Sequence, residues 1–424
     1  MKDNSKKYWR GLEELSNDPD FLKHAHNEFP EFLPMKEANG NTVEAGSGTD
    51  RRDFLKLLGF GVAAASLAAC EAPVNKAIPY LNKPVDVDPG IANYYASTYA
   101  NGGDYCSIVV KSRDGRPIKI EGNKLSSITQ GVASAQVQAS VLGLYDETRL
   151  RQFMAKGKAV DVNDYAAFDK DIIAKLEEAQ NSGKGIRIVS STIISPSTKK
   201  VIAEFKAKYP ATEHVTYDAS SASGLLKANE KSFGKAVVPS YDFSKANVIV
   251  SFGADFLGTW ISPIEYARQY SVNRKLGKSK KTMNKHYQFE SNLSLTGSNA
   301  DHRVPLKPSQ EGLFVAALYN KIAANKISVS GVNNETVNKA AADLMNNRGK
   351  SLVVSGSNDT NIQLLVNAIN AELGNYGTTI DLGTPSYVRQ GDDEAFMKFL
   401  GDVKEGKIGA VILYGANPVY DHPM

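Results

Sequence analysis

Short apolar runs and stretches of helical periodicity alternate along most of this chain, beginning near residue 165. The runs are rich in β-branched residues and predict strands, whereas apolar residues at intervals of three and four predict helices. The predicted strands cover 186–189, 214–217 and 246–252, and the predicted helices cover 165–180, 198–209 and 222–233. Because apolar strands that alternate with helices are typical of parallel sheets covered on both faces, we predict a doubly wound, mostly parallel α/β domain over 164–424.

The preceding segment, 94–163, shows a different pattern and predicts a small β-containing subdomain. Two runs rich in β-branched residues, 106–111 and 116–121, flank the dipeptide Asp114-Gly115. Since glycine tolerates the positive φ of tight turns, these runs predict a β-hairpin. Helical periodicity then predicts a helix over 136–152.

Three strands of the α/β part run into a similar turn, with a glycine, a small residue and an Asp or Asn. The positions singled out in these turns are Gly253, Asp255, Gly356, Gly415 and Asn417. Open α/β sheets bind ligands at the carboxyl ends of their strands, because backbone N–H groups and helix N-termini converge there. The alternative is that each glycine only lets the chain turn after a buried strand.

The N-terminal region shows the pattern of a targeting signal. Arg51 and Arg52 precede an apolar run, 57–69, that would reach about 20 Å as a helix, against about 30 Å of bilayer hydrocarbon. The run is therefore too short to span a membrane and is typical of a twin-arginine export signal. The alternative is a buried amphipathic helix, but apolar residues occupy every side of this run, whereas such a helix would show a polar face.

Cys70 directly follows the apolar run and is a candidate for lipid attachment. The next stretch is rich in proline and lacks a regular hydrophobic period, which indicates an extended spacer. We predict an unusually long leader and signal over 1–69, and a lipid-anchored tether over 70–93.

The composition narrows the possible chemistry. The net charge of +4 comes from 50 basic and 46 acidic residues, an imbalance too small over 424 residues to indicate nucleic-acid binding. Cys70 and Cys106 are the only cysteines, and neither lies in a CxxC or CxxCH motif. The chain therefore lacks the usual ligands of an iron–sulfur cluster or a covalent haem. Among six scattered histidines, His286 and His302 flank a segment across which they could meet, but a metal site needs further ligands.

The leader resembles that of the ActB family, whose members are subunits of alternative complex III, a bacterial quinol-oxidising respiratory complex. The segments that carry the resemblance are 8–15, 24–30, the twin arginine and Cys70, in this order. Further along, 115–123, 144–149 and 415–418 look like landmarks of the larger superfamily of molybdopterin oxidoreductases. The resemblance implies sheets of the molybdopterin oxidoreductase type, and a family member that continues into an iron–sulfur region, so this chain looks truncated at its C-terminal end.

The resemblance also implies a cofactor site, from which this sequence departs. Catalytic relatives carry an N-terminal cysteine quartet, whereas Cys106 stands alone. The segments 286–290 and 308–311 correspond to elements that recognise the dinucleotide cofactor, and both differ from the family pattern. Arg303 and Lys307 are the only obvious nearby cations for its phosphates. We therefore expect no cofactor and no metal in this chain, and we treat the five turn positions as vestigial.

These observations favour a structural role. We expect a non-catalytic assembly domain, lipid-anchored at the periplasmic face of the bacterial inner membrane, in a complex that passes electrons from quinol to cytochrome c or a terminal oxidase. The resemblance implies iron–sulfur clusters and haems c in the rest of the complex. It implies as partners an iron–sulfur domain or C-terminal half of the same subunit, multi-haem cytochrome c subunits, integral membrane quinol-oxidising subunits and a terminal oxidase.

Two other functions stay open at this point. One is the catalytic subunit of a molybdopterin-dependent reductase of the polysulfide or tetrathionate type; the other is a periplasmic lipoprotein that binds a small solute at the sheet edge. The basic run 274–281, with five positive charges in eight residues, predicts a solvated loop or a docking surface for an acidic partner.

Overall fold

The computed structural model describes residues 85–422, with gaps at 86, 89, 102–103, 279, 325, 330–331 and 333. The export signal at Arg51 and Arg52 and the lipidation candidate Cys70 lie outside the described residues. They stay predictions, as do the bounds of the four predicted domains.

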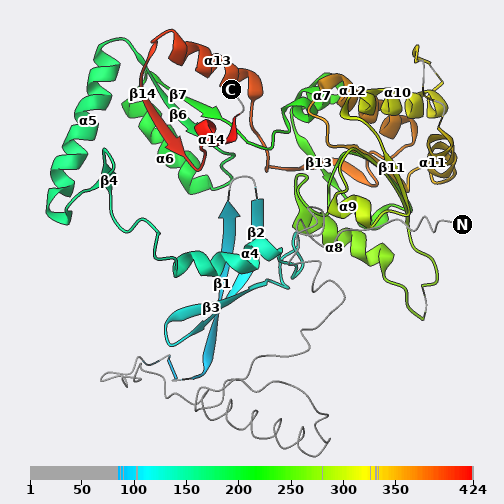
Figure 1. Ribbon diagram of the computed structural model, residues 1–424, viewed down its shortest axis with the longest axis horizontal. Helices are drawn as coiled ribbons and strands as arrows, with labels where there is room; N and C mark the ends of the chain where they lie inside the picture. Colours follow the sequence, from blue (N-terminus) through cyan, green and yellow to red (C-terminus); the bar gives the residue numbers. More distant parts are fainter. Residues whose placement is uncertain are drawn as a thin grey trace, which may run out of the picture. The chain divides into compact units, whose positions relative to one another are not determined.

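A three-stranded antiparallel sheet opens the described part of the chain. Its strands are β1 (Ala92–Asn101), β2 (Asp104–Arg113) and β3 (Arg116–Gly122). Asp114 and Gly115 both have positive φ, 50° and 74°, which is the conformation of a tight hairpin turn. The predicted hairpin is thus confirmed, and β1 adds a third strand that the sequence pattern did not show (Figure 1).

The helix predicted over 136–152 is wrong for most of its length. The chain forms only the short helix α4 (Ala135–Ala139) and a 3₁₀ helix, η1 (Ser140–Leu144). The Ser140 hydroxyl donates to the Val137 carbonyl, and the Asp146 carboxylate accepts from the Thr148 N–H at 2.8 Å. Such side-chain bonds compete with helical backbone bonds, so the helix ends early. Short elements follow: β4 (Met154–Ala155), β5 (Lys158–Ala159) and η2 (Val162–Asp164).

A four-stranded, fully parallel sheet in the order β11-β10-β9-β12 forms the larger α/β layer. Its strands are β9 (Val248–Phe252), β10 (Lys285–Glu290), β11 (His302–Pro305) and β12 (Ser351–Ser355). Alternate residues of β9 face opposite sides: Val250 packs in one buried cluster, and Ile249 packs in another. Because both faces of the sheet are buried, β9 and β12 are mostly apolar, as the sequence pattern predicted, whereas β10 buries the polar residues His286, Gln288 and Glu290.

Helices cover both faces of this sheet (Figure 1). Those that follow or precede its strands are α7 (Ser223–Phe233), α8 (Pro263–Arg274), α9 (Leu295–Ser298), α10 (Glu311–Ile322), α11 (Glu335–Asn346) and α12 (Thr360–Glu372). The 3₁₀ helices nearby are η3 (Phe243–Lys245) and η4 (Pro308–Gln310). An antiparallel pair, β8 (Val238–Tyr241) with β13 (Ile380–Ser386), accompanies this layer.

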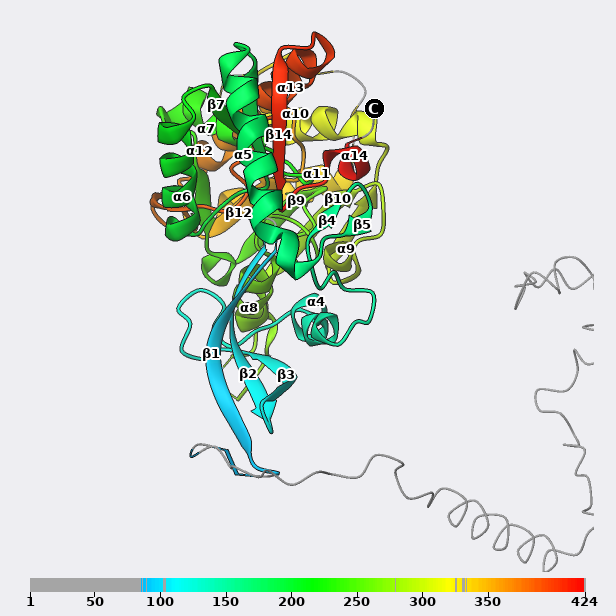
Figure 2. The same cartoon turned by 90° about the vertical axis from the view of Figure 1, so that its left-hand side faces the viewer.

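A second parallel sheet has three strands in the order β14-β6-β7. Its elements are α5 (Tyr165–Asn181), β6 (Gly185–Ser190), α6 (Pro196–Lys208), β7 (Thr212–Thr216), α13 (Asp393–Lys404), β14 (Ile408–Tyr414) and α14 (Pro418–Asp421). Helices α5 and α6 pack on one face, and α5 runs alongside β14 (Figure 2), whereas α13 packs on the other. The predicted α/β class with mostly parallel sheets is therefore confirmed.

The outer strand β14 is covered on one face only. Ala410 and Ile412 pack with α5 in a buried cluster, but Val411 and Leu413 on the opposite face are 43% and 50% exposed. On that face α13 contributes Phe396 and Phe399 to a cluster with residues of β6 and β7. No helix in the described part of the chain has the length and hydropathy needed to cross a bilayer.

Candidate functional site

The turns after β9 and β12 meet at the carboxyl edge of the four-stranded sheet. Gly253 has a φ of 60°, and its N–H donates to the Phe289 carbonyl; the Gly356 N–H donates to the Phe252 carbonyl. A Cβ added to Gly356 would lie 2.8 Å from the Gly253 carbonyl carbon and 3.0 Å from the Ala254 nitrogen. The two turns are thus in direct backbone contact, and glycine is needed for that close approach.

Asp255, the acidic residue of the first turn, is used inside the protein. Its Oδ1 accepts from the N–H and the hydroxyl of Thr296, at 3.0 and 2.7 Å. Its backbone carbonyl accepts from the N–H groups of three residues in the following loop: Gly258, Thr259 and Trp260. Asp255 therefore fixes this loop and the start of α9.

Glu290, at the end of β10, forms a buried ion pair with Arg303 on β11. The Arg303 Nε lies 2.6 Å from the Glu290 Oε1, and the glutamate is only 4% exposed. Ser294 donates to both carboxylate oxygens, and Gln288 donates to Oε2 at 3.1 Å. Burial alone would raise the pKa of Glu290, but the hydrogen bonds from Arg303 and Ser294 outweigh it and hold that pKa below its usual range.

The third turn lies on the other sheet, so the structure does not bring all five predicted positions together. Gly415 has a φ of 61° directly after β14, and the carbonyl of Asn417, which precedes α14, accepts from the N–H groups of Tyr420 and Asp421 at the end of that helix. At the same edge the buried Asp218 accepts from the Thr192 N–H and hydroxyl and from the Gly391 N–H. Asp218 and the Asn417 carbonyl, too, bind groups of the protein itself.

The residues at these edges do not fit the phosphate-rich dinucleotide that the family resemblance implies. Arg303, the main candidate for a phosphate contact, is bound to Glu290. Beside Gly253 lies the carboxylate of Glu311, which accepts from the Ser355 hydroxyl at 2.9 Å. Burial raises the pKa of Glu311, and the bond from Ser355 only partly offsets this. A bound phosphate would meet carboxyl groups where it needs donors.

The two histidines do not form a metal site. His286 is fully buried and contacts the Tyr270 hydroxyl, whereas the ring of His302 stacks on Tyr287. Burial lowers the pKa of His286 to about 4, so this histidine is neutral at pH 7. Across the described residues, no group of three His, Cys, Asp or Glu side chains is placed to hold a metal ion.

Cys106 lies in the core of the three-stranded sheet and α4, with an exposed fraction of 0%. Its Sγ lies 3.4 Å from the Val132 carbonyl, and burial raises the pKa of its thiol. A buried thiol of raised pKa is unreactive, because the thiolate is the reacting form.

We therefore expect Cys106 to resist modification. In a full-length Cys70→Ser variant, where Cys106 is the only thiol, the reaction with Ellman's reagent at pH 8 should be at least about 100-fold slower in buffer than in urea. A second variant adds Ala139→Cys at an exposed position of α4. Its new thiol should react fast, with one equivalent of reagent per chain. Complete labelling of Cys106 in buffer within minutes would contradict its burial.

The basic run 274–281 is partly used inside the protein. Arg274 forms a bidentate pair with Asp301, at 2.8 and 3.0 Å, and Lys280 donates to the Val272 carbonyl and the Asn273 side chain. Two of its five charges thus hold the segment between α8 and β10 in place.

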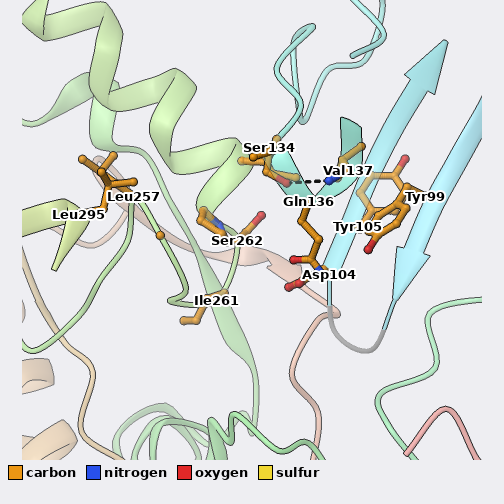
Figure 3. A pocket seen from close by; sticks show the side chains of 14 residues that line it. Tyr99, Asp104, Tyr105, Ser134, Gln136, Val137, Leu257, Ile261, Ser262 and Leu295 are labelled. Carbon is orange, nitrogen blue, oxygen red and sulfur yellow. Dashed lines mark hydrogen bonds between the residues drawn. The ribbon is translucent and has the colours of Figure 1, made fainter. Parts of the chain in front are cut away.

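A cavity of about 300 Å³ lies where β1, β2 and α4 meet the loops that follow β9 and β10 (Figure 3). Leu257, Ile261 and Ile264 form apolar wall, and Asp104 forms part of the polar wall. Asp104 is paired with Arg389 at 2.6 Å. Ile261 has a φ of 52°, a strained conformation for a β-branched residue.

Sequence analysis missed this cavity, because its walls come from segments more than 100 residues apart. The only local signal was Ser262-Pro263, a pair typical of a helix start. That signal marks α8 and says nothing of the hairpin that lies against it.

No family model matches the sequence, and no curated protein matches it. Among solved structures, the chain is similar to acetylene hydratase from Pelobacter acetylenicus, with 13% sequence identity and a TM-score of 0.46 over 66% of this chain and 43% of that chain. It is also similar to the formyltransferase/hydrolase complex from Methylorubrum extorquens in complex with methylofuran, with 11% identity and a TM-score of 0.33 over 48% of this chain and 55% of that chain. The chain thus spans less than two thirds of either one.

Proposed function

We propose that this chain is a structural domain of a membrane-bound, quinol-oxidising respiratory complex of the alternative complex III type. In this proposal the chain is exported through its twin arginine and anchored through Cys70 at the periplasmic face of the inner membrane. It corresponds to part of an ActB-like subunit, and its task is to hold redox-active partners in place. Electrons pass through the iron–sulfur clusters and haems c of those partners.

One observation carries the non-catalytic part of this proposal: the carboxyl edges of both sheets bind their own polar groups. Asp255, Glu290 and Asp218 each accept hydrogen bonds from neighbouring protein groups, and Gly253 and Gly356 close the space between two strands. Groups that are bound within the protein in this way are not available to a ligand. At these positions they support a role in stability instead.

The uncovered face of β14 supports the docking part. Val411 and Leu413 continue into α14, where Val419 and Tyr420 are 87% and 86% exposed. Exposed apolar side chains that gather on a surface mark interaction sites, and we propose these four as a docking surface. We assign it to the iron–sulfur region of the same subunit, the partner that the ActB resemblance implies.

The test is the composition of the complex that contains this chain. We expect the full-length protein, purified from its native membranes in mild detergent, to bring down haem c–containing subunits, with far less than one molybdenum or tungsten per chain. Mass spectrometry of the mature N-terminus should find an acylated Cys70. Haem absorption spectra measure the content of haem c, and metal analysis measures molybdenum and tungsten.

Two results would overturn the proposal. Stoichiometric molybdenum or tungsten with bound pterin would make the chain a catalytic subunit, for example of a polysulfide or tetrathionate type reductase. Isolation as a monomer free of haem proteins would remove the assembly role and favour a binding lipoprotein. If the chain purifies with redox-active partners of another kind, the quinol-oxidising assignment is refuted, whereas the assembly role is not.

A further inference from the structure

We infer that the cavity between the three-stranded sheet, α4 and the loop after β9 is a binding site for a small, uncharged aromatic alcohol. This inference concerns a site outside the proposed docking surface and does not depend on the proposed function. It rests on the shape, the lining and the construction of the cavity.

The apolar walls suit a flat hydrocarbon. Leu257 and Ile261 line one side, and Tyr99 and Tyr105 line the other (Figure 3), while Ile264 adds a further apolar group to the lining. A volume of about 300 Å³ lies at the lower end of the range for small-molecule sites, so the ligand is smaller than a typical drug. An aromatic body would gain from burial and from ring contacts with the tyrosines.

A polar pair at one end selects a hydroxyl group. The Asp104 Oδ1 accepts from Arg389, and no partner for its Oδ2 is found among the described residues. The side chain of Gln136 extends toward Asp104 from α4 (Figure 3). A hydroxyl can donate to the carboxylate and accept from the amide at once, whereas a carboxylate ligand would face Asp104 with like charge.

The wall that carries the apolar contacts is held rigidly. The Asp255 carbonyl accepts three N–H groups from the loop that leads to Ile261, and the Leu257 N–H donates to the Thr296 hydroxyl at 2.9 Å. These bonds keep Ile261 in its left-handed conformation at the cavity wall. A wall fixed before the ligand arrives lowers the ordering cost of binding. Asp255 is thus a positioning residue for this cavity.

The test is a titration of the full-length chain with 2-naphthol, which is uncharged at pH 7. Isothermal calorimetry should show saturable binding with a dissociation constant of about 10–500 µM, a range suited to a ligand of this size. The carboxylate analogue 2-naphthoate should bind at least about tenfold more weakly. Equal affinity for the two compounds would refute the role of Asp104 and Gln136.

A matched pair of variants locates the site. Ala135 lines the cavity at the start of α4 and is exposed, so Ala135→Trp should fill the space without disturbing the core and weaken 2-naphthol binding at least about tenfold. Ala139→Trp, on the same helix outside the lining, should leave the affinity unchanged. Leu295 is 56% exposed and lines the opposite wall. Leu295→Trp should therefore repeat the effect of Ala135→Trp.

Unchanged affinity in both cavity variants would overturn the inference, as would a lack of saturable binding to the native chain. If Ala135→Trp loses its native circular dichroism spectrum, Leu295→Trp decides alone, because it enters the cavity from another element. Loss of affinity in Ala139→Trp to the same extent would place the ligand elsewhere and refute the site.

Discussion

Replacing Arg303 by leucine should lower the free energy of unfolding by about 3–4 kcal/mol at pH 7. The substitution removes the cation from a carboxylate that is only 4% exposed, so Glu290 would be left charged and buried beside Ser294 and Gln288. Breaking a buried pair in this way costs more than the pair itself contributes, because the remaining charge has lost its compensation. Urea unfolding followed by circular dichroism measures the effect.

The pH dependence separates charge from packing in this variant. In the native chain the pKa of Glu290 is below its usual range, so its stabilising contribution is present above the unfolded-state pKa of about 4.3 and is lost as the pH falls through the folded-state pKa. Without Arg303 the largest remaining influence on the pKa of Glu290 is burial, which raises it. Protonation of Glu290 then removes the buried charge and stabilises the variant. Its deficit should therefore shrink between pH 7 and pH 5.

A deficit that stays constant over this pH range would mean that lost packing, not the buried charge, causes the destabilisation. The control is Lys339→Met, which removes a cation from an exposed pair with Glu335 on α11. It should leave the unfolding midpoint unchanged, because exposed pairs contribute little.

Gly356→Ala should destabilise the chain by about 3 kcal/mol, since the added methyl group has no room. Its neighbours would be backbone atoms of Gly253 and Ala254, which cannot rotate away as a side chain can. Relief would require the ends of β9 and β12 to separate, which would strain the bond from the Gly356 N–H to the Phe252 carbonyl. The same urea experiment measures the loss.

Gly401→Ala is the matched control. Gly401 lies inside α13, and a Cβ there would meet nothing within 4 Å. The change in the unfolded chain is the same as for Gly356→Ala, so only the folded states differ. We expect this variant to be stabilised by about 0.5–1 kcal/mol, the usual gain from alanine in a helix. Equal effects of the two substitutions would disprove the close approach of the two turns.

The α/β class followed from the sequence because local patterns determine it. The buried strand β9 is apolar except for Ser251, a run that is visible in the sequence, and α5 and α7 lie almost where the periodicity predicts them. The hairpin at Asp114-Gly115 could be predicted for the same reason, since its turn needs positive φ at two successive residues. The helix over 136–152 failed where side-chain hydrogen bonds, which periodicity does not record, ended it.

The role of each polar residue depends on partners that are distant from it in the sequence. Arg303 was a candidate phosphate ligand because nothing in the sequence pairs it with Glu290, which lies 13 residues earlier, on an adjacent strand. Asp104 and Arg389 are 285 residues apart, so nothing near either one indicates their ion pair. The glycine turns were located correctly at the ends of β9, β12 and β14, but the split between two sheets depends on strand order.

The outer position of β14 has a consequence for how the chain must be produced. Among the described strands it pairs only with β6, and its seven residues contain neither a charge nor a proline. Natural sheets usually protect such an edge with lysine, proline or a covering element, because unpaired edge strands of separate molecules form hydrogen bonds with one another. A chain made without its partner would therefore self-associate through β14, and its yield of monomer would fall as its concentration rises. Co-expression with the partner protects the same strand by occupying it.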